Sequence, residues 1–239
     1  RAGAAAVMER VPADPEALGR LRQAAAFRYP YPEDVATPSK LSVSELTHAS
    51  AGEERYFFRR RPKCLMGQSM TPTERGIAAH KFMQFADLAA AAEDPRKEAA
   101  RLRERGFITP EEADQMDLGM VEDFFRSPIG KRVLAADKVY REIRFLKEFT
   151  PGELEKAVPG LRIGGATVVQ GIADCVILEG ERGTIIDYKT DRVERGEELA
   201  ERYGIQLELY RAILEEYLGI PIREKVIYSF SLGREVPVP

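Results

Sequence analysis

The chain of 239 residues has only two cysteines, no tryptophan and no long apolar run. Two cysteines are too few for a disulfide scaffold, a zinc ribbon or a four-cysteine iron–sulfur cluster, and Cys64 and Cys175 also lie far apart in the sequence. The apolar runs are too short to cross a bilayer, and no charged segment followed by an apolar segment forms a secretory signal. We therefore expect a cytoplasmic protein with reduced thiols.

The chain also lacks an excess of charge of either sign. Its 36 Lys and Arg residues balance 39 Asp and Glu residues, for a net charge of −3. This balance counts against a nucleic-acid-binding protein, because such proteins are usually basic. With 44% hydrophobic and 31% charged residues, the chain is instead typical of a folded domain with one sizeable core or two small ones.

The first residues are expected to be an arm rather than part of the main domain. Residues 1–36 are rich in Ala, Pro and Arg, contain one predicted helix over Pro15–Phe27, and begin with Arg instead of Met. We interpret them as a linker from a missing upstream region, and residues 37–239 as the main domain. Within the latter, Ser42 and Glu45 have the spacing of a capping box and are expected to open a short helix.

Two clear helix starts follow. Thr71-Pro72-Thr73-Glu74 places Thr at the N-cap, Pro at N1 and Glu at N3, and Thr109-Pro110-Glu111-Glu112 repeats this arrangement. They predict helices over Gly76–Ala92 and Glu111–Phe125. Residues 93–105 carry charges of both signs and are expected to form a solvated helical face.

The back half of the chain predicts a sheet with one helix. Strands are expected over 139–145, 166–178 and 184–188, followed by a helix over 203–218 and a strand over 225–230. The predicted order is βββαβ after a helical front half, which makes the fold α/β.

Two aspartates are predicted to converge on this sheet. If the second and third strands join through Gly180-Glu181, Asp174 lies opposite Asp187, and Lys189 shares their face. Adjacent carboxylates repel one another, and a divalent cation such as Mg²⁺ removes that penalty. Taken alone, an Asp-x-Lys hairpin is more often a solvated strand end, and a register slip of one residue would separate the two carboxylates.

The two histidines and one polar pair on a helix have roles that the sequence alone does not decide. His80 has apolar neighbours at helical spacing, so composition alone favours an imidazole packed in the core. His48 is interpreted as an ordinary surface residue. Gln206 and Tyr210 share one helix face, which is suited to holding a phosphate or a catalytic residue, although tyrosine there also fills cores.

Four motifs follow one another in an order that resembles the RecB-type nuclease branch of the PD-(D/E)XK superfamily. They are Gly76-x-x-x-His80, Gly171-x-x-Asp174, Asp187-Tyr188-Lys189-Thr190 and Gln206-x-x-x-Tyr210. Residues 38–46, Arg141-Glu142-x-x-Phe145 and residues 187–193 are similar to the nuclease domains of AddAB-type helicase–nucleases. The resemblance covers residues 28–239. It implies an α/β restriction-endonuclease-like core (αβββαβ) with additional N-terminal helices.

The resemblance also implies a metal site and its chemistry. His80, Asp174, Asp187 and the backbone carbonyl of Tyr188 would hold Mg²⁺ or Mn²⁺, and Lys189 would be the catalytic lysine in hydrolysis of a DNA phosphodiester. The role implied for His80 replaces the core role that composition favoured.

Three further residues match positions that line the site beside the DNA backbone, with Glu142 in the outer part of it. These positions are Glu142, Gln206 and Tyr210. An iron–sulfur cluster is not expected, because the related nucleases that carry one use four cysteines and this chain has two.

The partners implied by the resemblance are single-stranded DNA, a helicase motor and an AddB-like subunit. The DNA would be the 3′-terminated strand during double-strand-break repair. The sequence has no Gly-x-x-x-x-Gly-Lys-Ser/Thr phosphate loop, so the motor and its ATP would lie upstream of Arg1. The rival hypotheses are a nuclease fold that only binds DNA or docks another protein, and a structural domain with an inert metal site.

One basic segment is a candidate DNA contact. It has three aromatic residues and five basic residues without an acid, namely Arg55, Arg59, Arg60, Arg61 and Lys63. Basic residues contact phosphates and aromatic rings stack on unpaired bases, while a packed strand with solvated arginines is an equally good interpretation. This local concentration means that the net charge of −3 is too coarse to exclude nucleic acid.

Overall fold

The computed structural model describes residues 14–30, 40–43, 70–159 and 164–239. Within these residues, six strands form one sheet in the order β1-β3-β4-β5-β6, and β2 pairs with β3. The strands are β1 (Lys40–Ser42), β2 (Lys138–Phe149), β3 (Thr167–Glu179), β4 (Arg182–Lys189), β5 (Ile222–Ser229) and β6 (Arg234–Val238). The predicted α/β class is confirmed.

The helices belong to two groups. The helices before β2 are α1 (Pro15–Ala26), α4 (Pro72–Phe85), α5 (Leu88–Glu93), α6 (Pro95–Glu104), α7 (Pro110–Gln115), α8 (Leu118–Arg126) and α9 (Pro128–Ala135). The helices among the later strands are α10 (Pro151–Ala157) and α11 (Gly196–Leu218). None of the described helices is long and apolar enough to cross a membrane.

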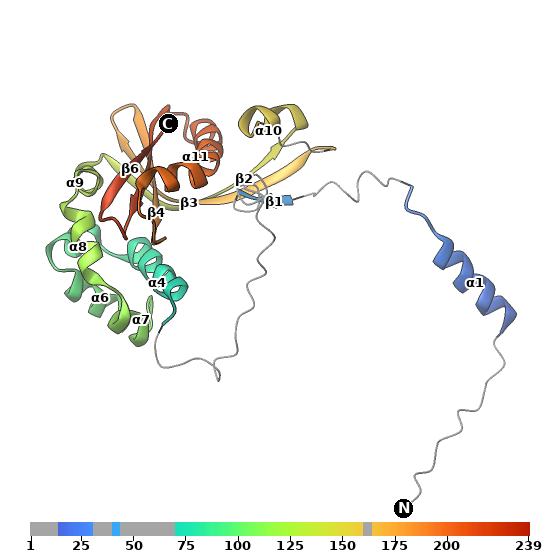
Figure 1. The fold of residues 1–239 in the computed structure, drawn as a ribbon, viewed down its shortest axis with the longest axis horizontal. Helices are drawn as coiled ribbons and strands as arrows, with labels where there is room; N and C mark the ends of the chain where they lie inside the picture. Colours follow the sequence, from blue (N-terminus) through green and yellow to red (C-terminus); the bar gives the residue numbers. More distant parts are fainter. Residues whose placement is uncertain (1–13, 31–39, 44–69, 160–163) are drawn as a thin grey trace, which may run out of the picture.

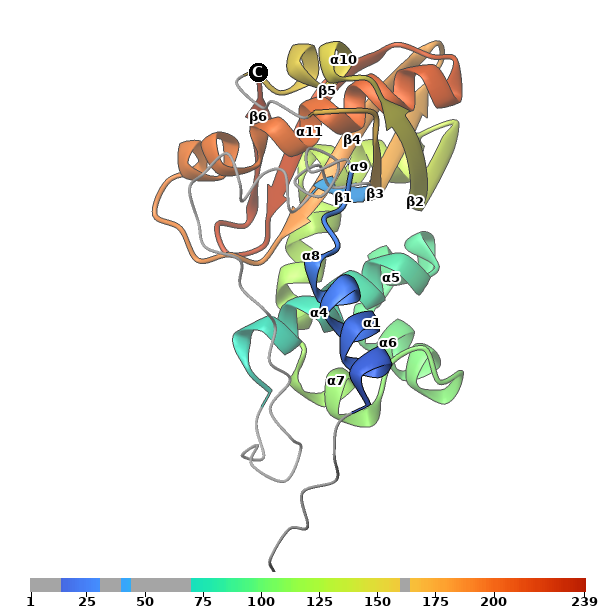
Figure 2. The same cartoon turned by 90° about the vertical axis from the view of Figure 1, so that its right-hand side faces the viewer.

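The two helix groups cover opposite faces of the sheet. Figure 1 shows α10 and α11 on one side and the group that includes α4, α6, α7 and α8 on the other, and in Figure 2 the latter group extends below the sheet. On the α11 side, the buried core includes Ile185, Leu207 and Ile213. On the other side, Phe124 and Tyr188 belong to a second core. Alternate strand residues therefore enter different cores.

Strand β3 is the centre of a fork in the sheet. Almost its whole length pairs with β2, and its other edge pairs with β1 over residues 168–170 and with β4 over residues 175–179. Between these two partners, residues 171–174 pair with neither β1 nor β4 in the part of the chain described. Asp174 therefore lies where β4 diverges from β3.

Two predicted helices are interrupted in the structure. The helix predicted over Gly76–Ala92 is wrong, because α4 ends at Phe85 and Asp87 caps a new helix by accepting from the backbone N–H of Ala90 at 3.0 Å. The helix predicted over Glu111–Phe125 is also wrong, because α7 ends at Gln115 and Asp117 caps α8 by accepting from the backbone N–H of Gly119 at 3.0 Å. An aspartate inside an apparently helical pattern supplies a cap that competes with continuation of the helix.

The segment 93–105 is not purely a solvated face. It forms α6, whose N-cap is Asp94, but Glu98, Ala99 and Leu102 are buried. Ser42, the predicted cap, is the last residue of strand β1, and its predicted partner Glu45 lies outside the described residues.

Every strand predicted in the back half is present, and each differs only in its bounds. Strands β1 and β6 and helix α10 were not predicted. Thr150-Pro151-Gly152-Glu153 forms a capping box at the start of α10, the same signal that predicts the helices after Thr71 and Thr109. Helix α10 was therefore readable from the sequence.

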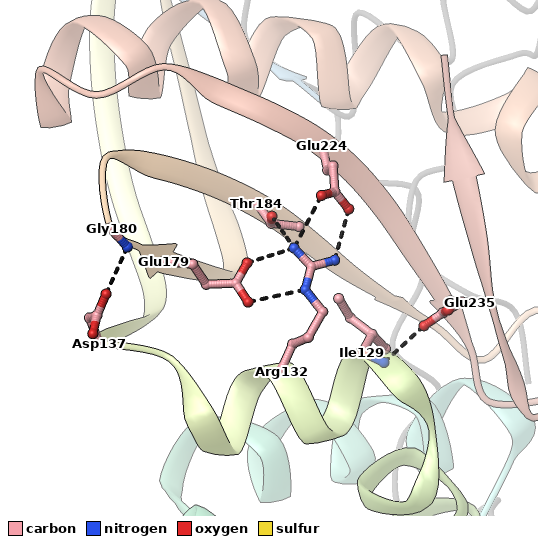
Figure 3. A network of polar contacts seen from close by, with 8 residues as sticks. All are labelled: Ile129, Arg132, Asp137, Glu179, Gly180, Thr184, Glu224 and Glu235. Atoms are coloured by element: carbon pink, nitrogen blue, oxygen red, sulfur yellow. Dashed lines mark hydrogen bonds and ion pairs between the residues drawn. The ribbon is translucent and has the colours of Figure 1, made fainter.

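At the hairpin end of β3 and β4, one arginine joins the helical group to the sheet (Figure 3). Arg132 of α9 donates to Glu179 and Glu224, and its Nη2 lies 3.0 Å from Thr184 Oγ1. These acceptors come from β3, β4 and β5. The network therefore ties one helix to three adjacent strands.

Candidate active site

The predicted hairpin register is confirmed. Glu179 pairs with Arg182, which leaves Gly180-Glu181 as a two-residue turn with Gly180 at φ 61°. Cys175 lies opposite Ile186, so Asp174 and Asp187 are the next residues along the two strands. There the backbone N–H of Tyr188 donates to Asp174 Oδ2 at 2.8 Å.

Asp187 is held from two sides in a buried position. Only 1% of the residue is exposed. Gln206 Nε2, on α11, donates to Asp187 Oδ1 and to the Tyr210 hydroxyl oxygen, both at 3.0 Å. Lys189 Nζ lies 2.5 Å from Asp187 Oδ2 as an ion pair. The structure therefore brings together four residues that the sequence predicted for the site.

His80 reaches the same place from α4. Its Nδ1 lies 3.6 Å from Asp174 Oδ1, and its ring meets the edge of the Tyr188 ring at a centroid distance of 6.2 Å. Partial burial lowers the pKa of His80, but the close contact with the negative charge of Asp174 outweighs this effect and leaves the pKa above its ordinary value. The imidazole therefore belongs to the carboxylate cluster rather than to an apolar core.

Two glycines of the sequence motifs leave room for this arrangement. A Cβ at Gly76 would lie 2.6 Å from Thr190 Oγ1, so glycine allows α4 to approach the end of β4. A Cβ at Gly171 would lie 2.3 Å from Cζ of Phe145, whose ring packs edge-on against Tyr210 at 5.3 Å. Both glycines position residues of the site without contacting the carboxylates.

Glu142 lies closer to the centre of the site than the sequence predicted. His80, Glu142 and Asp174 each place one ligand atom within 4.8 Å of the others, which makes them a candidate metal group. Arg141 and Ile143 keep their pairing with β3, but Glu142 between them adopts φ 53°. The alternation of residues in a strand does not predict this positive φ, so the sequence pattern could not place the Glu142 side chain.

The charges in the cluster are unevenly distributed between the two aspartates. Burial raises the pKa of Asp187 to about 6, with the Lys189 charge opposing this and the Asp174 charge adding to it. Burial also acts to raise the pKa of Asp174, but its contacts with His80 and the charge of Lys189 leave that pKa below its ordinary value. Burial and the neighbouring Asp174 raise the pKa of Glu142. Three converging carboxylates are thus under electrostatic strain in the protein alone.

The donor set fits a divalent cation. Two carboxylates and one imidazole supply hard and borderline ligands that suit such ions. Asp187 Oδ2 is buried and lies 2.5 Å from the Lys189 ammonium. Asp187 and the Tyr188 carbonyl remain predicted ligands beside the group of three.

Some predicted residues lie outside the described part of the chain. These are His48, Cys64 and the candidate DNA contacts Arg55, Arg59, Arg60, Arg61 and Lys63. Cys175 is described, buried, and packed in the core on the α4 side of the sheet.

Comparisons with known proteins agree with the geometry. The family model described as the PD-(D/E)XK nuclease superfamily matches residues 40–230. An ATP-dependent helicase/nuclease subunit from Geobacillus thermodenitrificans is 33% identical over 92% of this chain and 20% of its own length. The protein of the same name from Alkaliphilus oremlandii is 36% identical over 88% of this chain and 18% of its own length.

The chain thus spans about one fifth of the length of the curated relatives it matches. The family model covers most of the chain, from β1 to the end of β5, and includes every residue of the cluster. The chain belongs to the PD-(D/E)XK nuclease superfamily.

Proposed function

We propose that this nuclease is a Mg²⁺-dependent deoxyribonuclease domain that hydrolyses phosphodiester bonds of single-stranded DNA. The observation that carries the proposal is the convergence of His80, Glu142 and Asp174 at the fork of the sheet, with Asp187 and Lys189 beside them. A carboxylate-rich group next to a buried lysine suits phosphoryl chemistry better than it suits a structural sheet.

Each residue has a definable role in the proposed reaction. Burial opposes the charge on Lys189, but the Asp187 and Asp174 carboxylates raise its pKa, so it remains an ammonium that stabilises negative charge developing on phosphate. Gln206 fixes the orientation of Asp187. A bound Mg²⁺ would supply Lewis-acid polarisation of the phosphate and an activated water. His80, Glu142, Asp174, Asp187 and the Tyr188 carbonyl are the proposed ligands.

The biological setting follows from the similar proteins. Their name joins a helicase with a nuclease, and the similarity extends over about nine tenths of this chain. We infer that the domain serves a cytoplasmic bacterial helicase–nuclease of the AddAB type in double-strand-break repair. It would cut the 3′-terminated strand delivered by an ATP-driven motor, in complex with an AddB-like subunit.

The proposal is tested by cleavage of end-labelled single-stranded DNA in Mg²⁺, in Mn²⁺ and in EDTA. Wild-type chain is compared with Asp174→Ala, with Lys189→Ala and with the matched control Asp114→Ala, whose side chain is 72% exposed on α7. We expect cleavage only with metal, and a loss of at least about 100-fold in both site variants but not in the control.

Equal residual cleavage in all four samples would indicate contamination and would overturn the assignment. If no sample cleaves, calorimetric titration with Mn²⁺ decides. Binding that is lost in Asp174→Ala and kept in Asp114→Ala supports the metal site and leaves the reaction to the complete helicase–nuclease. Absence of binding in the wild-type chain favours the rival hypothesis of a non-catalytic docking module.

A further inference from the structure

A groove of about 480 Å³ lies between the end of α4, the helices α5 and α6, and strand β2. Its lining includes three arginines, Arg101, Arg105 and Arg141, together with the ring of Phe85. This arginine groove lies outside the metal group and was not predicted from the sequence, which placed its basic DNA contacts at residues 55–63.

The acidic residues of the arginine groove are already engaged. Glu98 is buried, binds the Arg101 guanidinium, and accepts from the backbone N–H of Asp87 at 2.6 Å. The Asp87 carboxylate caps α5. By contrast, the exposed side chain of Arg105 has no hydrogen bond or ion pair with any residue that the structure describes. With Glu98 paired to Arg101, the remaining Arg105 and Arg141 outnumber the Asp87 carboxylate, which leaves the groove with an excess of one positive charge.

Arg141 forms part of the floor of the arginine groove. Its Nη1 donates to the carbonyl oxygens of Met83 at 3.1 Å and Ala86 at 2.6 Å, which fixes the guanidinium against the last turn of α4. A guanidinium has five N–H donors, and these two bonds use only one of its nitrogens. Arg141 is thus a pre-oriented cation with donors left for a ligand.

An exposed aromatic pair borders the same groove. Phe85 is 37% exposed and Phe107 is 40% exposed, and their rings stack at 4.6 Å with an interplanar angle of 21°. The two rings together form one exposed aromatic surface at the edge of the groove. Aromatic rings beside arginines are the combination that binds unpaired bases and their phosphates.

The arginine groove and the metal group share their supporting elements. His80 and Phe85 both lie on α4, five residues apart, which corresponds to about 7.5 Å along the helix axis. Arg141 precedes Glu142 directly on β2. Five residues are also about 140° apart around the helix, so the arginine groove and the metal group lie on different sides of α4 while sharing α4 and β2 as supports.

We propose that the arginine groove binds single-stranded DNA outside the metal group, with phosphates held by Arg105 and Arg141 and a base stacked on the Phe85–Phe107 pair. The inference rests on the proposed nuclease function and adds the path of its substrate. Duplex DNA does not fit this role, because its paired bases present no free face to the aromatic pair.

The test is binding of a fluorescent oligothymidylate to the full chain in EDTA, measured by anisotropy over a series of salt concentrations. The groove variants are Arg105→Ala and Phe107→Ala. Their matched controls are Arg96→Ala, an exposed arginine of α6 outside the groove, and Phe27→Ala, an exposed phenylalanine that follows α1. All four positions are exposed, and thermal melts of each variant check that the fold is kept.

We expect Arg105→Ala to reduce the slope of log K against log salt by about 0.7, the value for one lost phosphate contact on a single strand. Phe107→Ala should weaken binding roughly 5- to 150-fold at unchanged slope, because it removes a stacked base. Both controls should match the wild-type chain.

Groove variants that bind like their controls would overturn the inference, as would a wild-type chain that does not bind the oligonucleotide at low salt. Cleavage of the same oligonucleotide in Mg²⁺ separates the two proposals. If the wild-type chain cleaves the oligonucleotide but the groove variants bind it normally, the proposed groove is wrong and the proposed nuclease function is supported. If the groove variants weaken binding but the wild-type chain shows no metal-dependent cleavage, the proposed nuclease function is wrong and the proposed DNA-binding groove is supported.

Discussion

Glu142 occupies a backbone conformation that residues other than glycine rarely adopt. Its φ of 53° is the only positive value at a non-glycine residue in the described ranges. Such a conformation costs about 1–2 kcal/mol and persists only where the surrounding structure imposes it. Its neighbours in β2 keep a regular ladder, so the deviation is confined to the residue whose carboxylate meets His80 and Asp174.

We predict that Glu142→Gly increases stability and abolishes function. Glycine relieves the strained φ, and loss of the carboxylate removes repulsion with Asp174. Glu142→Gln removes the charge but keeps the strained φ. In the absence of metal, the free energy of unfolding of the glycine variant should therefore be about 1 kcal/mol higher than that of the glutamine variant. Urea denaturation measures the difference, and Mn²⁺ calorimetry should show weaker binding in both variants. A glycine variant less stable than the glutamine variant would contradict the strain.

The sequence predicts those site residues whose placement follows from regular geometry. Asp174, Asp187 and Lys189 share a face because strands alternate and because a two-residue turn sets the register. His80 needed the family resemblance, since its approach depends on close packing of Gly76 against Thr190. The central position of Glu142 depends on one unusual φ, and Arg105 meets Phe85 only through packing of separate helices. Neither feature has a periodic signal.

At the scale of elements, buried Glu98 connects α6 to the start of α5. It accepts from the N–H of Asp87, the N-cap of α5, while lying on α6 and binding Arg101. The Arg101 hydrogen bond is the main reason that the pKa of Glu98 is below its ordinary value of 4.5. A single carboxylate thus links α5 to α6, the helix for which the charge pattern of residues 93–105 predicts only a solvated face.

This depressed pKa predicts a pH dependence. A carboxylate with a lowered folded pKa stabilises the protein above its ordinary pKa, and that stability is lost as pH falls from 4.5 through the lower folded value. Glu98→Gln keeps an acceptor for Asp87 but loses the ionic bond, so it should cost about 1–3 kcal/mol at pH 7. The cost should vanish in acid. The measurement is the urea midpoint of unfolding as a function of pH, with the exposed Glu104→Gln as the control variant. The same pH dependence in both variants would contradict the proposed role of Glu98.

At the scale of the whole molecule, one sheet separates two cores, and the site lies where both helix groups reach the fork. His80 comes from the α4 side, whereas Gln206 and Tyr210 come from α11. Correct geometry at the site thus requires both groups to be fixed on the same sheet. The Arg132 network is a candidate for this function at the far end of the strands, because it spans α9, β3, β4 and β5 (Figure 3).

We predict that Arg132→Leu costs about 1 kcal/mol in free energy of unfolding, since Glu179 and Glu224 are partly solvated and their ion pairs are screened. A double-mutant cycle with Glu179→Gln isolates the pair. The matched cycle uses Arg126→Leu and Glu122→Gln, an ion pair within helix α8 that joins no separate elements. Urea denaturation should give a coupling energy for Arg132 and Glu179 above the roughly 0.3–0.5 kcal/mol of a helical pair. Equal coupling energies in the two cycles would mean that the Arg132 network does not stabilise the packing of α9 on the sheet more than an ordinary helical ion pair would.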